Sequence, residues 1–382
     1  MTLTGPYFLW IVVLLTVAVF AGAIVVLPHV SGFRPVAIAY RALVLFLVNL
    51  MVLLSAAVIL NDKYAFYADW TDVRGALFGG RVRSTAHAGG AAAQAANTRL
   101  GSSALGPSVG PLPPLPPGAG SADRVLRFQL TGPRSGLHGF VLVTLPEGYT
   151  HSANATRRYP VLETFPGYPA DPSQWTDSMR LGAVLDNAVA AHSTGAVITL
   201  SPLTEFPPGI DTECVNGTGN DPMVETWLTR DVPDWAQRTF RVQPGRASWA
   251  TLGLSAGGWC AAMATMLHPD RYATGIAMGG YFKPEFSAKY TPFGSHSSQA
   301  RRYDLVALAR RAPPPVALWL ETSHSDKISY ASTAKLLAAT RAPLSIQALV
   351  LTHAGHRLSL WSAELPAAIS WLGKNIPGFA YR

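Results

Sequence analysis

The chain has 382 residues, of which 49% are hydrophobic and only 14% charged. This composition is too apolar for an ordinary soluble protein, and the excess lies at one end, because no Asp or Glu precedes Asp62. The net charge of +8 is spread along the chain without a cluster of Lys and Arg interleaved with aromatic residues. That pattern excludes a nucleic-acid partner and supports at most a mild attraction to anionic lipid or envelope polymer.

Two long uncharged runs open the chain. Residues 7–27 and residues 42–60 are each long enough, as helices rising about 1.5 Å per residue, to cross a hydrocarbon core of about 30 Å. A cleaved signal peptide followed by a single anchor is the alternative. However, no Lys or Arg precedes the first run, which is also longer than a signal peptide requires. The sequence therefore predicts two transmembrane helices within residues 1–62 and a multi-pass protein of the cell membrane.

Positive charge predicts the topology of these helices. Arg34 and Arg41 lie in the short connection between the two runs, so the positive-inside rule places that connection in the cytoplasm. Both termini then face outward, so the part of the chain that follows the second run is extracytoplasmic. Four basic residues that follow the second run count against this orientation: Lys63, Arg74, Arg81 and Arg83.

Residues 63–122 are predicted to be a juxtamembrane segment followed by a disordered linker. Residues 84–122 are rich in Ala, Gly, Ser and Pro and carry too little apolar surface to order themselves. The juxtamembrane segment instead carries a cluster of aromatic residues, which suits the membrane–water interface. These residues are Tyr64, Phe66, Tyr67 and Trp70.

Residues 123–382 are predicted to form one domain, because short apolar runs alternate there with helix-like stretches. The predicted strands are Val125–Leu130, Gly139–Leu145, Val161–Phe165, Ala196–Leu200, Ala250–Leu254, Val316–Leu320 and Ile346–Leu351. The predicted helices lie around residues 176–191, 223–238, 257–267, 331–340 and 363–373. This alternation indicates an α/β class with a mostly parallel sheet covered by helices on both faces.

The sharpest motif is Gly253-Leu254-Ser255-Ala256-Gly257, between the strand-like WATLGL and a helix-like stretch. A serine on a tight strand-to-helix turn, with glycines where side chains would clash, is typical of a nucleophile elbow. The same five-residue pattern surrounds Ser108, but that serine lies in the Pro-rich linker. Context therefore selects Ser255 as the candidate nucleophile over a structural turn serine.

A serine nucleophile needs a base, and the base needs an orienting acid. In this architecture the acid and then the histidine follow the nucleophile along the chain. His356 follows a glycine in the loop after the last predicted strand and is preferred to His353, which lies closer to the strand end. As the acid, Asp326 in a loop is preferred to Glu321 at a strand end, because the carboxylate must reach across the sheet edge to the histidine.

Stabilisation of an oxyanion would need two backbone N–H donors. Ala256, directly after the nucleophile, is expected to supply one. The other is expected from the loop 165–169, whose two prolines lack an N–H, so the donor is Gly167 or Tyr168. Position in the loop favours Tyr168.

The chain resembles the putative-esterase branch of the α/β-hydrolases, which includes esterase D and the mycobacterial mycolyltransferases. The resemblance covers about residues 123–375 and rests on YPVLETFPGYP, ETWLTRDVPDWA, GLSAGGWCA and GHRLSLWSAELPAAISWL. It implies the α/β-hydrolase fold, with the nucleophile, acid and histidine at Ser255, Asp326 and His356 and the loop oxyanion donor at Tyr168. With NDKYAFYADW after the second span, the whole arrangement looks like actinobacterial membrane-anchored esterases.

The resemblance leaves three functions open and implies no cofactor or metal. The leading hypothesis is hydrolysis of a carboxylic ester through an acyl-enzyme on Ser255. The second hypothesis is acyl transfer to a cell-envelope lipid or sugar, which proceeds through the same intermediate. Pro166 and Pro169 replace the charged residues that help hold trehalose in the mycolyltransferases, which speaks against trehalose. The third is a non-catalytic binding protein on the same fold, for which a complete set of serine, acid and histidine would be superfluous.

Cys214 and Cys260 are too few for a metal site and are either separate buried thiols or one disulfide. A disulfide would persist in an extracytoplasmic domain. It would also link the long loop DTECVNG covalently to the helix that follows Ser255. We expect the disulfide. Asp211 and Glu213 in that loop either line an acyl or alcohol pocket or are solvated, and we expect a solvated loop.

Overall fold

The computed structural model describes residues 3–79, 83–88, 111–120 and 124–381. The chain divides into two compact units. The N-terminal unit comprises Met1–Val82, Ser323–Lys327 and Leu351–Arg357. The sheet unit comprises Arg83–Thr322, Ile328–Val350 and Leu358–Arg382. Two loops from late in the chain therefore group with the N-terminal helices.

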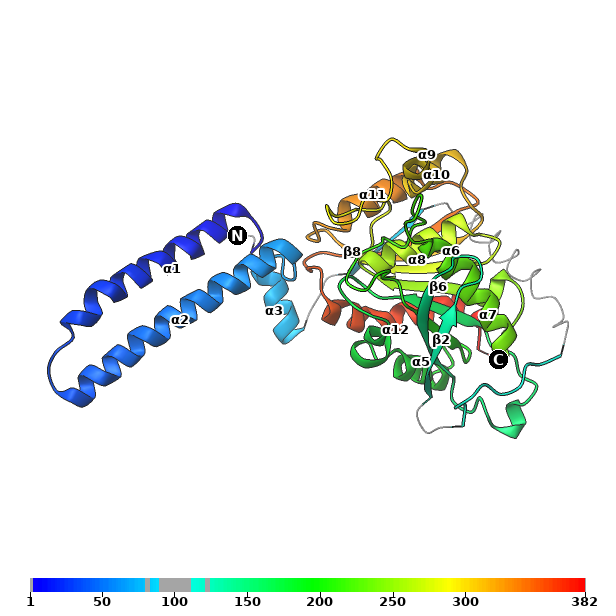
Figure 1. Cartoon of the computed structure of the whole chain (residues 1–382), viewed down its shortest axis with the longest axis horizontal. Coiled ribbons are helices and arrows are strands. Elements are labelled where there is room, and N and C mark those ends of the chain that lie inside the picture. The colour runs from blue at the N-terminus through cyan, green and yellow to red at the C-terminus, as the bar shows by residue number, and fades with distance from the viewer. Residues whose placement is uncertain (1–2, 80–82, 89–110, 121–123, 382) are drawn as a thin grey trace. The chain divides into compact units, whose positions relative to one another are not determined.

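A helical hairpin forms most of the N-terminal unit. Helix α1 (Pro6–Val26) continues through a 3₁₀ turn (Leu27–His29), and α2 (Arg34–Tyr64) returns alongside α1 (Figure 1). Thr16 Oγ1 lies 2.7 Å from Ser55 Oγ between the two helices, while most of their large apolar side chains are exposed. By length and composition both helices are able to cross a membrane, and α1 also fits a signal sequence because it lies near the N-terminus.

The chain turns sharply where α2 ends. Ala65 caps α2 in the left-handed conformation, with φ of 53°. Asp69 then caps the short helix α3 (Trp70–Phe78) by accepting the Asp72 N–H at 2.9 Å. The aromatic residues that the sequence placed at a membrane interface thus belong to an ordered turn and helix.

The sheet unit is built on nine strands in the order β1-β9-β8-β7-β6-β4-β5-β3-β2. Strand β3 runs antiparallel to β2 and β5, whereas neighbouring strands from β5 through β4, β6 and β7 to β8 are parallel. The strands are β1 (Arg83–Ala88), β2 (Val125–Thr131), β3 (His138–Thr144), β4 (Val161–Phe165), β5 (Ile198–Pro202), β6 (Trp249–Leu254), β7 (Thr274–Met278), β8 (Ala317–Ser323) and β9 (Ser345–Leu351). This mixed, mostly parallel sheet confirms the predicted α/β-hydrolase fold.

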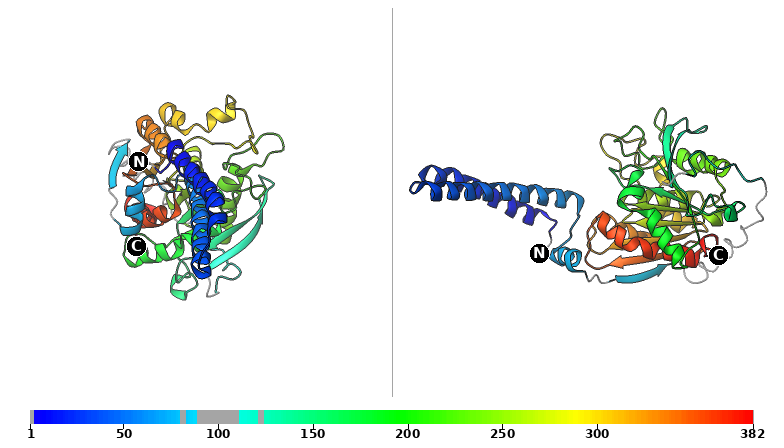
Figure 2. Two further views of the ribbon diagram at one scale, coloured as in Figure 1. Left: turned by 90° about the vertical axis from the view of Figure 1, so that its left-hand side faces the viewer. Right: turned by 90° about the horizontal axis from the view of Figure 1, so that it is seen from below.

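Helices cover both faces of the sheet (Figures 1 and 2). On one face α8 (Ala256–Leu267) packs on β4, β6 and β7; on the other, α5 (Leu181–Ala190) packs against α12 (Leu358–Asn375). Each face has its own apolar core, with Trp259 buried on the α8 side and Trp371 on the α12 side. The remaining helices are α6 (Val224–Thr226), α7 (Val232–Thr239), α9 (Ser298–Arg302), α10 (Leu305–Arg311) and α11 (Tyr330–Ala339), with π-helical turns at Gln174–Ser178 and Trp227–Asp231.

The structure adds elements that were not predicted. Strand β1 lies where the disordered linker was expected to begin, and Ser84 Oγ donates to the Val350 carbonyl of β9 at 3.2 Å. Strand β7, TGIAM, was missed because it is short and contains small residues that give no strand pattern. Residues 80–82, 89–110 and 121–122 of the predicted juxtamembrane segment and linker lie outside the described residues.

Glu163 is a buried carboxyl in the middle of β4. Its Oε2 accepts the Tyr272 hydroxyl at 2.7 Å. Burial raises its pKa to about 8, against the opposing effects of that hydrogen bond and of Arg271. Because the folded pKa lies above the ordinary value of 4.5, the folded state holds the extra proton across this window. The contribution of Glu163 to stability is therefore fully present below about pH 4.5 and is lost as the pH rises towards 8.

Glu163→Gln should remove this loss, since the amide keeps an acceptor for Tyr272 but does not ionise. Between pH 5 and 8, the unfolding free energy of the variant minus that of the wild type should rise by up to about 1.4 kcal/mol per pH unit. Denaturant unfolding at several pH values measures the difference, with the exposed Glu147→Gln as control. Parallel pH dependence in wild type and Glu163→Gln would contradict the prediction.

Candidate active site

Ser255 lies on a tight turn between β6 and α8 and has φ of 53° and ψ of −119°, a conformation that non-glycine residues rarely adopt. The flanking glycines are required by close backbone approach. A Cβ on Gly253 would lie 1.8 Å from the Gly257 carbonyl oxygen, and a Cβ on Gly257 would lie 2.1 Å from the Phe165 carbonyl oxygen. The predicted elbow geometry is therefore present, and strain of this kind persists where surrounding structure enforces it.

The loop after β4 passes close to this turn. A Cβ on Gly167 would lie 3.6 Å from Ser255 Cβ. The Gly167 N–H already donates to Gln174 Oε1 at 3.0 Å, which favours Tyr168 as the second donor for an oxyanion. Ala256 opens α8, where the first backbone N–H groups have no partner within the helix. Both predicted donors therefore lie on segments next to the elbow.

The candidate base and acid form a hydrogen-bonded pair within the N-terminal unit. His356 Nδ1 lies 2.9 Å from Asp326 Oδ2, and both residues are buried, at 7% and 4% exposure. A carboxylate at Nδ1 fixes the tautomer in which Nε2 carries no proton and can act as a base. The two loops thus pair the residues that the sequence proposed as histidine and acid.

The alternative histidine and acid have different partners. His353 Nδ1 lies 2.8 Å from Asp69 Oδ2, and its side chain is half exposed. Glu321 is buried in β8, and its backbone oxygen accepts the Gly279 N–H at 2.9 Å. Among the four residues, His356 and Asp326 are therefore the pair with the geometry of a base and its orienting acid.

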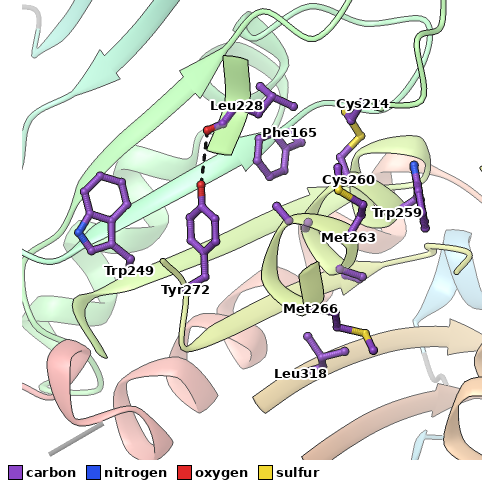
Figure 3. Packing of buried hydrophobic residues seen from close by; sticks show 14 of the residues in the cluster. Phe165, Cys214, Leu228, Trp249, Trp259, Cys260, Met263, Met266, Tyr272 and Leu318 are labelled. Atoms are coloured by element: carbon purple, nitrogen blue, oxygen red, sulfur yellow. Dashed lines mark hydrogen bonds between the residues drawn. A yellow bond between two sulfur atoms is a disulfide. The ribbon is translucent and has the colours of Figure 1, made fainter. Parts of the chain in front are cut away.

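Cys214 and Cys260 form a disulfide, as predicted, which joins the loop before α6 to helix α8 (Figure 3). Its neighbour Glu213 is only 2% exposed, so the expectation of a solvated loop is wrong there. The Tyr281 hydroxyl donates to Glu213 Oε1 at 2.6 Å, and the Glu213 carbonyl accepts from Trp259 Nε1. Burial, followed by the nearby charge of Asp211, raises the pKa of Glu213 well above its ordinary value. Sequence missed this burial because the loop is polar.

One contact of the loop that carries His356 was not predicted at all. Residues that directly follow α2 bind the loop that carries His356, through backbone hydrogen bonds and a buried ion pair between Asp72 and Arg357. No local motif marks such a contact, since the two residues are 285 positions apart. Among the described residues, no group of three or more His, Cys, Asp or Glu side chains is placed to hold a metal ion.

The fold and the elbow define an α/β-hydrolase. The chain belongs to the esterase family described as "Putative esterase", which matches residues 139–372. An uncharacterized protein of Corynebacterium glutamicum is 30% identical over 136 residues, which are 36% of this chain and 32% of that protein. The matched part thus spans about a third of that relative's length.

Solved structures share the fold at low sequence identity. A ferulic acid esterase aligns with a TM-score of 0.55 and 18% identity, covering 66% of this chain and 97% of that one. An S-formylglutathione hydrolase from Agrobacterium tumefaciens aligns with a TM-score of 0.56 and 14% identity, over 67% and 97%. The fluorophosphonate-binding serine hydrolase F of Staphylococcus aureus has a TM-score of 0.53 and 14% identity, over 65% and 97%. These likenesses confirm the fold, and the family confirms an esterase-type hydrolase.

Proposed function

We propose that the chain is a membrane-anchored serine esterase that hydrolyses carboxylic esters outside the cytoplasm through an acyl-enzyme on Ser255. The observation that carries the proposal is the strained turn at Ser255, which begins helix α8 with a hydroxyl-bearing residue at positive φ. A purely structural turn at this position would be satisfied by glycine without strain.

The chemistry follows from the residues. His356 takes the proton from the Ser255 hydroxyl, and the oxygen attacks the ester carbonyl carbon. The N–H groups of Ala256 and Tyr168 stabilise the resulting oxyanion. His356 then protonates the departing alcohol, and a water activated by the same histidine hydrolyses the acyl-enzyme. Asp326 holds the imidazole in the required tautomer and stabilises its charged form.

The membrane anchor and the outward topology rest on two observations. Helices α1 and α2 have the length and composition of spanning helices, with Arg34 and Arg41 in the connection between them. The sheet unit also carries a disulfide, a bond that persists mainly in oxidising compartments. An enzyme anchored at the outer side of the membrane would have access to an ester substrate in the lipid or polymer of the cell envelope.

A membrane-impermeant fluorophosphonate probe tests these points together, and a relative in fold is described as binding such probes. Intact cells that express the full chain should be labelled, and labelling should be lost in Ser255→Ala and His356→Ala. Ser108→Ala, in the second match to the five-residue pattern, is the matched control and should label like the wild type.

Each alternative outcome has a definite meaning. Labelling only after cell lysis would refute the outward topology but keep the nucleophile. Failure of the folded wild-type chain to label in lysed membranes would refute the enzyme and favour a binding protein. If an ester is consumed only when an alcohol acceptor is supplied, the reaction is acyl transfer rather than hydrolysis.

A further inference from the structure

Asp72 is a fully buried carboxylate directly downstream of the second candidate membrane helix. Its two oxygens accept four hydrogen bonds within the N-terminal unit. Arg357 Nη1 and Nη2 each donate at 2.7 Å, one to each oxygen, in a two-pronged pair. The backbone N–H groups of Gly355 and Ala68 donate to Oδ2 at 2.8 Å and 3.1 Å. The carboxylate therefore ties the loop around residue 356 to the turn after α2.

Arg357 is buried although its side chain carries a positive charge. Its side chain is only 6% exposed, and Nη1 also donates to the Phe66 carbonyl at 2.9 Å. The guanidinium lies over the Tyr67 ring, 4.6 Å from the ring centroid. A buried cation requires a partner, so the aromatic and acidic residues after α2 compensate a charge that the histidine loop brings into the interior.

The backbone next to the histidine ring is held in the same way. The His356 N–H donates to the Ala65 carbonyl at 2.8 Å. Gly355 approaches the same turn so closely that a Cβ there would lie 2.1 Å from the Phe66 carbonyl oxygen. Three consecutive residues, 355 to 357, are thus each bound by the segment of residues 65–72, while the His356 ring faces Asp326.

We infer that residues 65–72 position the catalytic histidine, with Asp72 as the central positioning residue. The inference rests on the proposed function, in which His356 is the base. Asp326 fixes the tautomer of the ring, and the segment 65–72 fixes the backbone from which the ring projects. The segment therefore affects the rate of the chemical step through the backbone of the loop that carries the histidine.

The test uses the full-length chain in detergent and a chromogenic ester as substrate. Asp72→Asn keeps the shape of the side chain but replaces one of the two accepting oxygens with an NH₂ group, which cannot accept a hydrogen bond. It also removes the negative charge that compensates Arg357. We expect kcat per active site to fall by about 100-fold with KM nearly unchanged, the loss that a misplacement of about 1 Å produces. Active sites are counted by end-point fluorophosphonate labelling, so that a loss of folded protein is separated from a slower reaction.

Asp62→Asn is the matched control. It removes a carboxylate charge near the end of α2, outside residues 65–72, where Asp62 accepts the Gly5 N–H at 2.7 Å, and it should leave kcat within a few-fold of the wild type. If Asp72→Asn fails to fold, Arg357→Lys provides the second variant, because it keeps the cation and loses the two-pronged geometry. It should lower kcat per labelled site in the same direction.

The outcomes separate this inference from the proposed function. Turnover that depends on Ser255 establishes the enzyme whatever Asp72 does. Given that turnover, wild-type kcat per labelled site in Asp72→Asn and in Arg357→Lys would overturn the positioning role alone. A fall only in the number of labelled sites, at unchanged kcat, would also overturn it. A wild-type chain without turnover that depends on Ser255 would overturn both.

Discussion

Ser255→Ala is expected to lower kcat for ester hydrolysis by about 10⁶-fold, and His356→Ala by a similar factor. The two losses should not multiply in the double variant, because the serine and its base act as one unit and neither works without the other. The measurement is the steady-state rate of the purified full-length chain on a short-chain chromogenic ester. Residual activity within tenfold of the wild type in Ser255→Ala would contradict the assignment.

Substitution of the triad acid should cause a smaller loss of kcat than substitution of the serine or the histidine. The same measurement distinguishes Asp326 from Glu321, the two carboxylates proposed from the sequence. Asp326→Ala should lower kcat by about 10⁴-fold, less than the serine or the histidine, because the imidazole still functions in part without its orienting partner. Glu321→Gln should keep kcat close to the wild-type value, since His356 is paired with Asp326. A larger loss in Glu321→Gln than in Asp326→Ala would reverse the assignment.

Removal of the disulfide is expected to have the largest effect on stability. Cys214 and Cys260 are separated by 46 positions, and closing a loop of that size stabilises a folded chain by about 4 kcal/mol in the chain-entropy description. The double variant Cys214→Ser/Cys260→Ser should therefore unfold at a clearly lower temperature, which tryptophan fluorescence can follow.

Reducing agent supplies the control for this stability prediction. It should lower the unfolding temperature of the wild type towards that of the double variant, and it should leave the double variant unchanged. An unfolding temperature that is the same for wild type and variant would show that the bridge contributes no stability.

Much of the catalytic part could be predicted because its signals are local. Strand β4 has the predicted bounds, and β6 and β9 begin one residue before theirs. The pattern around Ser255 combines a buried strand, glycines that close approach requires and an apolar helix, all within a few residues. His356 and Asp326 were chosen from the order of residues along the chain and from their places in loops after strands, and the structure brings those two together.

The features that could not be predicted depend on contacts between residues that are far apart in the sequence. The segment RSTAHA resembles the rest of the linker in composition and becomes strand β1 only because the sheet offers an edge beside β9. Glu213 lies in a polar loop and is buried because Tyr281, Trp259 and the neighbouring disulfide surround it. No periodicity or motif reports pairings of this kind, since they form only when the fold is complete.

The ion pair between Asp72 and Arg357 restricts how a chain of this kind can be rearranged. A gene fusion that replaced α1, α2 and the turn after them with another segment would keep Arg357 and discard its carboxylate, leaving an uncompensated charge beside the histidine. These helices with their turn and the loop of residues 355–357 are therefore not independently exchangeable. Changes at positions 65–72 and 355–357 have to be inherited together, although 285 positions separate Asp72 from Arg357 in the chain.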